Sequence, residues 1–124
     1  SDWKTGDPTK MDQRMLEIVA ERFRALGDPS RLAIVSILRG GEHSVGDLAQ
    51  ELGLRHGTVS AQLRVLETAG LVAKRKQGTR VFYRLEGDCV EKVCSLICSD
   101  VAHSLTEQAS MFQSFANETK SKKD

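Results

Sequence analysis

The segment from Ser44 to Ala69 constrains the fold of this chain more than any other part of the sequence. Its first half spaces apolar residues as one face of a helix requires; they are Val45, Leu48, Ala49 and Leu52. Ser44 is suited to cap this helix, and Gly53 is suited to end it. A second helix is predicted from Gly57 to Ala69, with one apolar face formed by Val59, Leu63 and Leu66. Two short helices joined at a glycine form a helix-turn-helix.

A β-hairpin is predicted directly after this motif. Residues 71–76 and 80–85 have the composition of two short strands, and apolar and polar residues alternate in the second. Gln77-Gly78-Thr79 between them has the composition of a tight turn. A cationic hairpin that follows a helix-turn-helix is the wing of a winged helix.

Three further helices complete the prediction. They cover residues 11–26, residues 29–38 with Asp28 as the cap, and a long segment from about Asp88 towards Phe115. The predicted fold class is therefore mainly α with a small β-hairpin wing, a winged helix-turn-helix domain over residues 11–116. We expect the polar residues 1–10 and the polar tail 117–124 to be disordered.

A strongly basic window lies inside a chain whose formal net charge is only +1. Residues 55–84 carry seven basic side chains and one acidic side chain, whereas residues 85–118 carry one basic and six acidic side chains. A face that only meets water rarely concentrates one sign of charge so heavily. The window therefore favours a polyanionic partner, and nucleic acid is the first candidate.

The second helix of the motif is the element that would enter the major groove of DNA. With about 100° of rotation per residue, burial of its apolar face leaves mostly short side chains and Arg64 pointing outward. Short residues let the helix approach the bases, Arg64 can reach a phosphate or a guanine edge, and the wing cations can hold the backbone. The predicted DNA-binding residues are His56, Gly57, Thr58, Ser60, Ala61, Gln62 and Arg64 on the helix, and Lys74, Arg75, Lys76 and Arg80 on the wing. The alternative is a helix whose polar face is only solvated.

Several other classes of protein are disfavoured. No apolar run approaches the roughly 20 residues that span a bilayer, and the first ten residues have no apolar core of a secretory signal. Three cysteines, an odd number, argue against a disulfide scaffold and for a reduced, cytoplasmic setting. The sequence has no Cys-x-x-Cys, glycine-rich phosphate loop or serine nucleophile elbow, so we do not expect an enzyme.

From Phe23 to about Leu105 the chain resembles the ArsR/SmtB family of metal- and thiol-responsive bacterial repressors. The matching segments are FRALGDPSRLAIVSIL, SVGDLAQELGL, HGTVSAQLRVLETAGLV and KRKQGTRVFYRL. The resemblance implies a homodimer that binds a palindromic operator in double-stranded DNA and releases it when an effector binds. We expect residues 11–26 and the final helix to form the dimer interface.

Two of the family's sensing sites are missing from this sequence. The Cys-x-Cys of one metalloid site is replaced by Ser44 and Gly46. The cysteine in the second helix of a persulfide-sensing branch is replaced by Ser36.

The resemblance implies a third site on the final helix, with two ligands from each subunit. Its positions fall on Gly87, Cys89, Asp100 and His103, and the last three could coordinate a metal. These three share one face of a helix, so Cys89 of one chain could meet Asp100 and His103 of the other across an antiparallel pair. Thiolate, carboxylate and imidazole suit zinc or a similar divalent ion, such as cadmium.

Cys94 and Cys98 lie on another side of the same helix, with Val101 and Leu105. They are either small buried apolar residues, a bridge for a soft metal or for arsenite, or a reversible disulfide. The leading prediction is a repressor released by a metal or metalloid ion. The alternatives are a thiol-redox or persulfide-responsive repressor acting through Cys94, Cys98 and Cys89, and a winged-helix DNA-binding protein without an effector.

Overall fold

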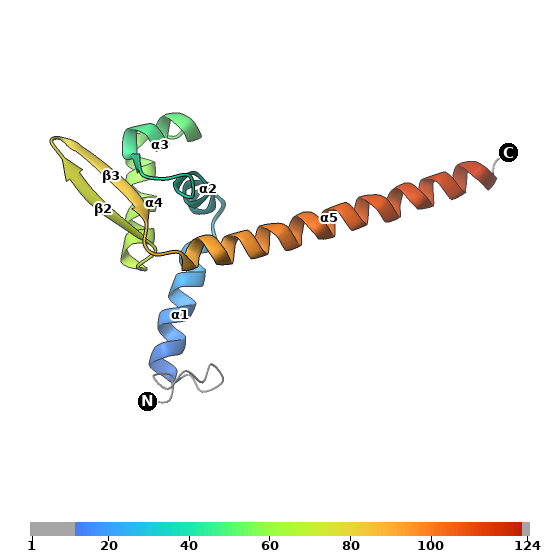
Figure 1. Cartoon of the computed structure of the whole chain (residues 1–124), viewed down its shortest axis with the longest axis horizontal. Helices are drawn as coiled ribbons and strands as arrows, with labels where there is room; N and C mark the ends of the chain where they lie inside the picture. Colours follow the sequence, from blue (N-terminus) through green and yellow to red (C-terminus); the bar gives the residue numbers. More distant parts are fainter. Residues whose placement is uncertain (1–11, 123–124) are drawn as a thin grey trace. The chain divides into compact units, whose positions relative to one another are not determined.

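The computed structural model describes residues 12–122 (Figure 1). The segment 1–10, predicted to be disordered, lies outside the described residues. The chain divides into two units after Asp88, an N-terminal domain and a long C-terminal helix.

The N-terminal domain contains four helices and a small sheet. In chain order these elements are α1 (Gln13–Leu26), α2 (Pro29–Leu38), β1 (His43–Ser44), α3 (Val45–Leu52), α4 (His56–Thr68), β2 (Val72–Gln77) and β3 (Arg80–Leu85). The predicted helix-turn-helix is α3 and α4, and the predicted wing is the antiparallel pair of β2 and β3. The mainly helical fold with a hairpin wing is thus the one that the sequence indicates.

The sheet contains one strand that the sequence did not predict. The strand order is β1-β3-β2, and β1 pairs His43 with Tyr83 and Ser44 with Phe82. A two-residue strand is too short to show the alternation by which strands are recognised in a sequence. Its effect is to fix the start of α3 against the middle of β3.

The predicted helix signals are present in the structure. The Asp28 side chain accepts a hydrogen bond from the backbone N–H of Arg31 at 3.1 Å, and Ser44 Oγ accepts one from the N–H of Asp47 at 3.0 Å. Gly53 ends α3 in the left-handed region, with φ of +65°. This conformation, which favours glycine, makes the turn between the two helices of the motif.

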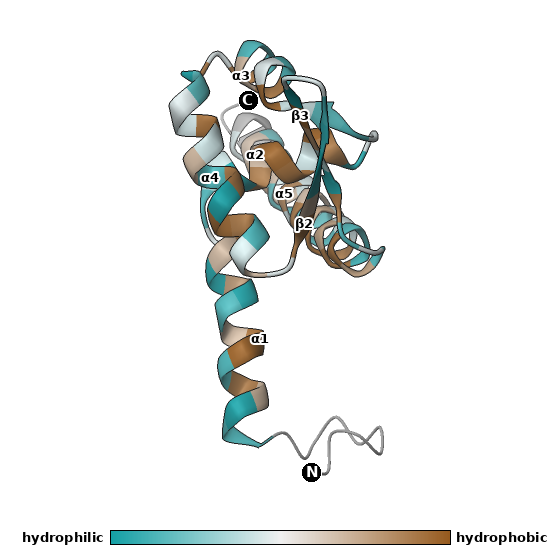
Figure 2. Cartoon of the chain, turned by 90° about the vertical axis from the view of Figure 1, so that its left-hand side faces the viewer, coloured by the Kyte–Doolittle hydropathy of each residue, from teal (hydrophilic) through white to brown (hydrophobic). Residues whose placement is uncertain are grey.

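The core of the domain lies between α2, α3 and α4. Six side chains are less than 2% exposed: Ile34, Val35, Leu48, Val59, Leu63 and Leu66. The three from α4 are those predicted as its buried face. Burying one such side chain stabilises the fold by about 1.5–3 kcal/mol, so the rotation of α4 about its axis is firmly set. Figure 2 shows that α1, in contrast, carries apolar and polar patches along its length, and its Phe23 is 58% exposed.

The C-terminal unit is helix α5 (Cys89–Lys122), 34 residues long. At 1.5 Å per residue it measures about 50 Å. The predicted end near Phe115 is too early, because residues 117–122, expected to be a disordered tail, continue the helix. The segment contains no glycine or proline, and Thr119 Oγ1 donates to the carbonyl of Phe115 at 3.0 Å within the helix. In the part of the chain described, no helix is both long and apolar enough to cross a membrane.

Replacing Gly53 should destabilise the domain through the backbone alone. A Cβ at this position would meet no atom within 4 Å, but a left-handed residue other than glycine costs about 1 kcal/mol. We expect Gly53→Ala to lower the free energy of unfolding by about that amount in chemical denaturation. Gly46→Ala in the same helix is the matched control, and it should be neutral or stabilising because Gly46 has no positive φ. Equal effects of the two changes would contradict this account of the turn.

Candidate nucleic-acid interface

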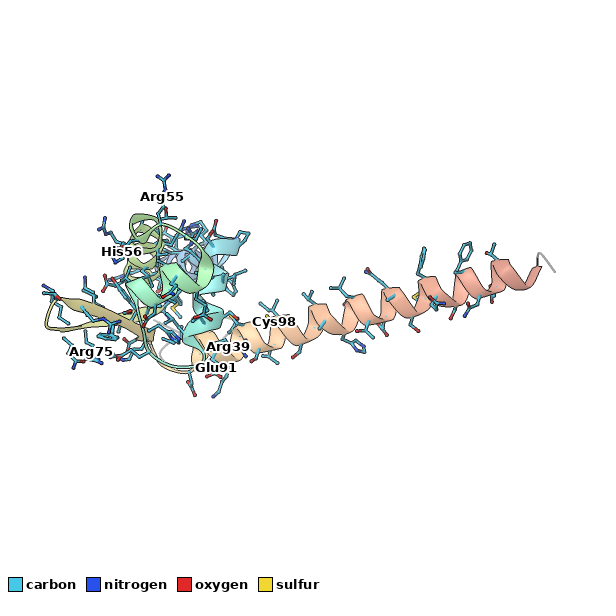
Figure 3. The ribbon with its side chains drawn as sticks, turned by 90° about the horizontal axis from the view of Figure 1, so that it is seen from above. Arg39, Arg55, His56, Arg75, Glu91 and Cys98 are labelled. Carbon is cyan, nitrogen blue, oxygen red and sulfur yellow. The ribbon has the colours of Figure 1, made fainter. Side chains whose placement is uncertain are left out.

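A groove of about 610 Å³ lies between the start of α3, the outer side of α4 and the wing. It is lined by seven of the eleven residues predicted to bind DNA: His56, Ser60, Arg64, Lys74, Arg75, Lys76 and Arg80. In Figure 3, His56 is labelled at the start of α4 and Arg75 on the wing. The structure therefore brings the second helix of the motif and the cationic hairpin together around one concave surface.

The N-terminal half of α4 is open to the outside. Gly57, Thr58 and Ala61 are exposed and short, so a flat or convex partner can approach the helix backbone closely. The N-cap residue Arg55 makes no side-chain hydrogen bond to the first turn. The first N–H groups of the helix are therefore uncapped by a side chain, an arrangement that suits an anionic group such as a phosphate.

Among the predicted DNA-binding residues of α4, Gln62 has a side chain that hydrogen-bonds within the domain. Its side chain is half-buried, and its Oε1 accepts a hydrogen bond from Arg31 Nη1 at 2.8 Å. Arg31 Nε also donates to the carbonyl of Ala25 at 2.6 Å. The amide oxygen of Gln62 thus helps to join α4 to α2 and to the end of α1. No local sequence pattern indicates this contact, because it joins residues 31 positions apart.

Three wing cations lie beside carboxylates from the helix-turn-helix segment and the loop before it. The pairs are Lys74–Glu67 at 3.5 Å, Arg75–Glu42 at 2.5 Å and Arg80–Asp47 at 3.6 Å. The hydrogen bonds from Arg75 and its positive charge hold the pKa of Glu42 below its ordinary value. None of these acidic residues was among the predicted site residues: Glu42 and Asp47 lie outside the basic window, and Glu67 is the single acidic side chain within it. Part of the positive charge counted in the sequence is therefore balanced inside the domain.

Arg64 and Lys76 differ from the three paired cations. Both are exposed and both line the groove. Neither side chain has an ion-pair or hydrogen-bond partner among the residues that the structure describes. Their charges are available to an external anion without the loss of an internal contact. They are the strongest candidates for direct contacts to a phosphate backbone.

The predicted metal ligands all lie on α5. Cys89, Asp100 and His103 are exposed, and His103 Nε2 lies 3.6 Å from Glu107 Oε1. Along one helix, the 11 positions between Cys89 and Asp100 correspond to about 16 Å, too far for both to bind one ion. Within residues 12–122 of a single chain, no three possible ligands are gathered at one place. The predicted site therefore requires ligands from two subunits.

The two remaining cysteines differ in their surroundings. Cys94 is 8% exposed, whereas Cys98, labelled in Figure 3, is exposed. The burial of Cys94 matches the interpretation of this residue as a small apolar side chain. Cys98 remains accessible to reagents in the single chain.

The known proteins to which this chain is similar are DNA-binding regulators, in agreement with the groove described above. The family model described as "Bacterial regulatory protein, arsR family" matches residues 28–74. The chain is 38% identical over 93 residues to the biofilm growth-associated repressor of Agrobacterium fabrum, a match that covers 72% of this chain and 79% of the relative.

Solved structures share the fold. The homodimeric winged helix-turn-helix DNA-binding domain Mb0332 from Mycobacterium bovis, a possible ArsR-family regulator, superposes with a TM-score of 0.69 at 34% identity. That match covers 75% of this chain and 88% of the other. The transcriptional repressor BigR from Xylella fastidiosa gives a TM-score of 0.62 at 33% identity, covering 72% and 95% of the two chains. The predicted fold class and the predicted family are thereby confirmed.

Removing either unpaired cation of the groove should weaken DNA binding at every sequence. Each phosphate contact contributes about 0.9 to the slope of log affinity against log salt. We expect Arg64→Ala and Lys76→Ala each to lower affinity and to reduce that slope by about one contact, measured by fluorescence anisotropy over a salt series. Gln50→Ala on α3, an exposed residue outside the groove, is the control and should leave both quantities unchanged. Wild-type affinity in both groove variants would show that the interface is elsewhere.

Proposed function

Because this chain belongs to the arsR family of bacterial regulatory proteins, we propose that it is a transcriptional repressor that a metal or metalloid ion releases from its operator. The family consists of DNA-binding transcription regulators, so the chain is a DNA-binding regulator and not an enzyme. The observation that carries the proposal is the groove in which the outer face of α4 and the wing cations meet. Such a regulator acts on genomic DNA, so we place it in the cytoplasm.

In the proposed complex, α4 enters the major groove with its N-terminal half. Ser60 and Ala61 are short enough to let the backbone come near the base edges, and Arg64 reaches either a guanine or a phosphate. The wing lies along the adjacent backbone, where Lys76 contacts phosphate. These contacts position the domain, while the choice of operator depends on the few side chains of α4 that reach bases.

We propose that the repressor is a homodimer formed through α1 and α5. The structural relative from Mycobacterium bovis is described as homodimeric. In this chain, large apolar side chains on both helices are 43–74% exposed: Leu16, Ile18 and Phe23 on α1, and Leu96, Ile97, Val101, Leu105, Met111, Phe112 and Phe115 on α5. Exposed apolar surface on this scale is typical of an interface. A twofold dimer would read a palindrome whose half-sites lie about 34–36 Å apart.

The effector site proposed for this dimer lies on α5. Cys89 of one subunit and Asp100 and His103 of the other would supply sulfur, oxygen and nitrogen ligands, a set that fits zinc or cadmium. Their exposure in the single chain leaves them accessible to an ion. Cys94 and Cys98 are the alternative ligands for a soft ion or for arsenite, although the burial of Cys94 favours a packing role for that residue.

Release of DNA requires that ion binding at α5 is coupled to the arrangement of the two DNA-binding domains of the dimer. Since α5 lies in the proposed dimer interface, an ion that bridges the two copies of α5 would change the angle at which both domains meet DNA. Coupling free energies of about 1–3 kcal/mol are usual for such linked sites, which corresponds to roughly 5–150-fold in operator affinity.

A charge in the apolar face of α5 should break the dimer. We expect Val101→Glu to shift the protein towards monomers in sedimentation equilibrium and to weaken operator binding, because a buried carboxylate without a partner is costly. Ser99→Glu, exposed and about 200° away around the helix, is the matched control and should remain dimeric. A dimer of wild-type stability in Val101→Glu would exclude this face of α5 as the interface.

The effector can be identified by titration of the protein–DNA complex. With reduced protein and a non-chelating reductant, we expect zinc, cadmium or arsenite to release an operator duplex in fluorescence anisotropy. If the ion binds the first set of ligands, Cys89→Ser and His103→Ala should abolish release without changing DNA affinity in the absence of the ion, whereas Cys98→Ser should respond normally.

If Cys98→Ser abolished release while Cys89→Ser and His103→Ala responded normally, the ion site would be assigned to Cys94 and Cys98. Tight DNA binding that none of the three ions affects would exclude the metal and metalloid proposal. Hydrogen peroxide and polysulfide would then test the thiol alternative, and no response to them would leave a repressor without an effector.

A further inference from the structure

The side chain of Arg75 is 45% exposed, yet its guanidinium is held by other side chains of the domain. Its Nε donates to both carboxylate oxygens of Glu42 at 2.9 Å, and its Nη2 donates to Oε1 at 2.5 Å. Its Nη1 donates to Gln77 Oε1 at 2.9 Å, and its Cζ lies 4.6 Å from the centre of the Phe82 ring. All three nitrogens thus have protein acceptors, and an aromatic ring lies against the guanidinium. Multidentate and stacked arginines form the stronger class of charged contacts.

Arg80 makes a second set of internal contacts beside the first. Its Nη2 donates to Ser44 Oγ at 3.0 Å and lies 3.6 Å from Asp47 Oδ2, and its Cζ lies 5.0 Å from the centre of the Phe82 ring. Ser44 Oγ also accepts the N–H of Asp47, which caps α3. Arg80 therefore ties strand β3 of the wing to the first turn of the helix-turn-helix.

Phe82 lies at the centre of this arrangement. In the sheet it stands opposite Arg75 on β2 and opposite Ser44 on β1. Both arginines pack against its ring, so this side chain joins β2 to β3. The link to β1 comes from Ser44, whose Oγ accepts the hydrogen bond from Arg80. We name the whole group the wing clamp; its members are Glu42, Ser44, Asp47, Arg75, Arg80 and Phe82.

We propose that the wing clamp positions the wing against the start of α3 and the loop before it, and that Arg75 and Arg80 act on DNA recognition through this clamp rather than by direct contact with phosphate. The inference rests on the proposed DNA-binding function and divides the wing cations into two kinds. Lys76, together with Arg64 of α4, neutralises phosphate. Arg75 and Arg80 hold the hairpin at the angle at which these contacts and those of α4 can form together.

Two physical reasons support this division. In the sheet that the structure describes, the hairpin pairs beyond its own two strands only with the two-residue β1, so its direction depends largely on side-chain contacts with the helix-turn-helix segment and the loop before it. In addition, a phosphate that drew Arg75 away would leave the ionised Glu42 carboxylate unpaired beside the anionic backbone. The internal pair avoids this repulsion, so Arg75 gains little by leaving it.

The variant Glu42→Ala separates the clamp from a direct contact, because the two predict opposite signs. If Arg75 bound phosphate, loss of the carboxylate would release its charge and tighten DNA binding. The clamp predicts instead that affinity for an operator duplex falls by about three- to fivefold, within the range of one partly exposed ion pair. Affinity for an unrelated duplex of equal length should change by less than twofold, and the salt slope should stay at its wild-type value.

The operator duplex would be selected from a random-sequence pool with the wild-type protein, and affinities would be measured by fluorescence anisotropy. The matched control is Lys76→Ala, which should weaken both duplexes alike and flatten the salt slope by about one contact. A circular-dichroism melt of each variant confirms that it is folded before its affinity is compared.

The charge-reversed pair gives the second arm of the test. Arg75→Glu alone should lose operator preference, and the double variant Glu42→Arg with Arg75→Glu should recover at least half of the lost preference, because the ion pair is rebuilt with its ends exchanged. Unchanged or tighter operator binding in Glu42→Ala, or a double variant no better than Arg75→Glu, would overturn the clamp. A wild-type protein that binds no duplex would refute the proposed function itself, which is a different result.

Discussion

Burial of one face of α4 is the constraint on which the rest of the domain depends. Val59, Leu63 and Leu66 are completely buried against the core, so the rotation of the helix has a single favourable value. The outer face towards the groove then carries Gly57, Ser60, Ala61 and Arg64, which are short apart from Arg64. A domain that rotated α4 by half a turn would bury Arg64 without a partner at large cost, so the same packing that stabilises the fold selects the surface that meets DNA.

The total charge of this domain does not show which of its cations are paired with carboxylates. The basic window from residue 55 to residue 84 contains cations of two kinds, those that lie beside carboxylates and those that have no internal partner. The first kind stabilises the position of the wing, and the second kind remains for phosphate. The surface can thus be cationic enough to attract DNA. At the same time, the position of the wing is fixed by ion pairs that need not break when phosphate binds.

Helix α5 has a different physical character from the N-terminal domain. Its apolar side chains remain exposed over most of its length, so the single chain leaves much of its hydrophobic surface without a partner. The proposed effector ligands are spread along this helix at distances that only a second copy could bring together. Dimer formation and effector binding would therefore involve the same element, so an ion bound to α5 could influence DNA binding by α4.

Local patterns in the sequence were sufficient to predict the helix-turn-helix, the wing, the caps at Asp28 and Ser44 and the buried face of α4. Each of these features depends on residues that lie close together in the sequence. They were not sufficient for strand β1, for the Gln62–Arg31 contact or for the internal pairing of the wing cations. Arg75 and Glu42 are 33 positions apart, and Arg80 and Ser44 are 36 positions apart. By itself, the sequence determined that a recognition helix and a cationic hairpin exist. Only the tertiary structure decided which cations form ion pairs within the protein, because these pairs depend on which distant carboxylates the packed domain brings beside each cation.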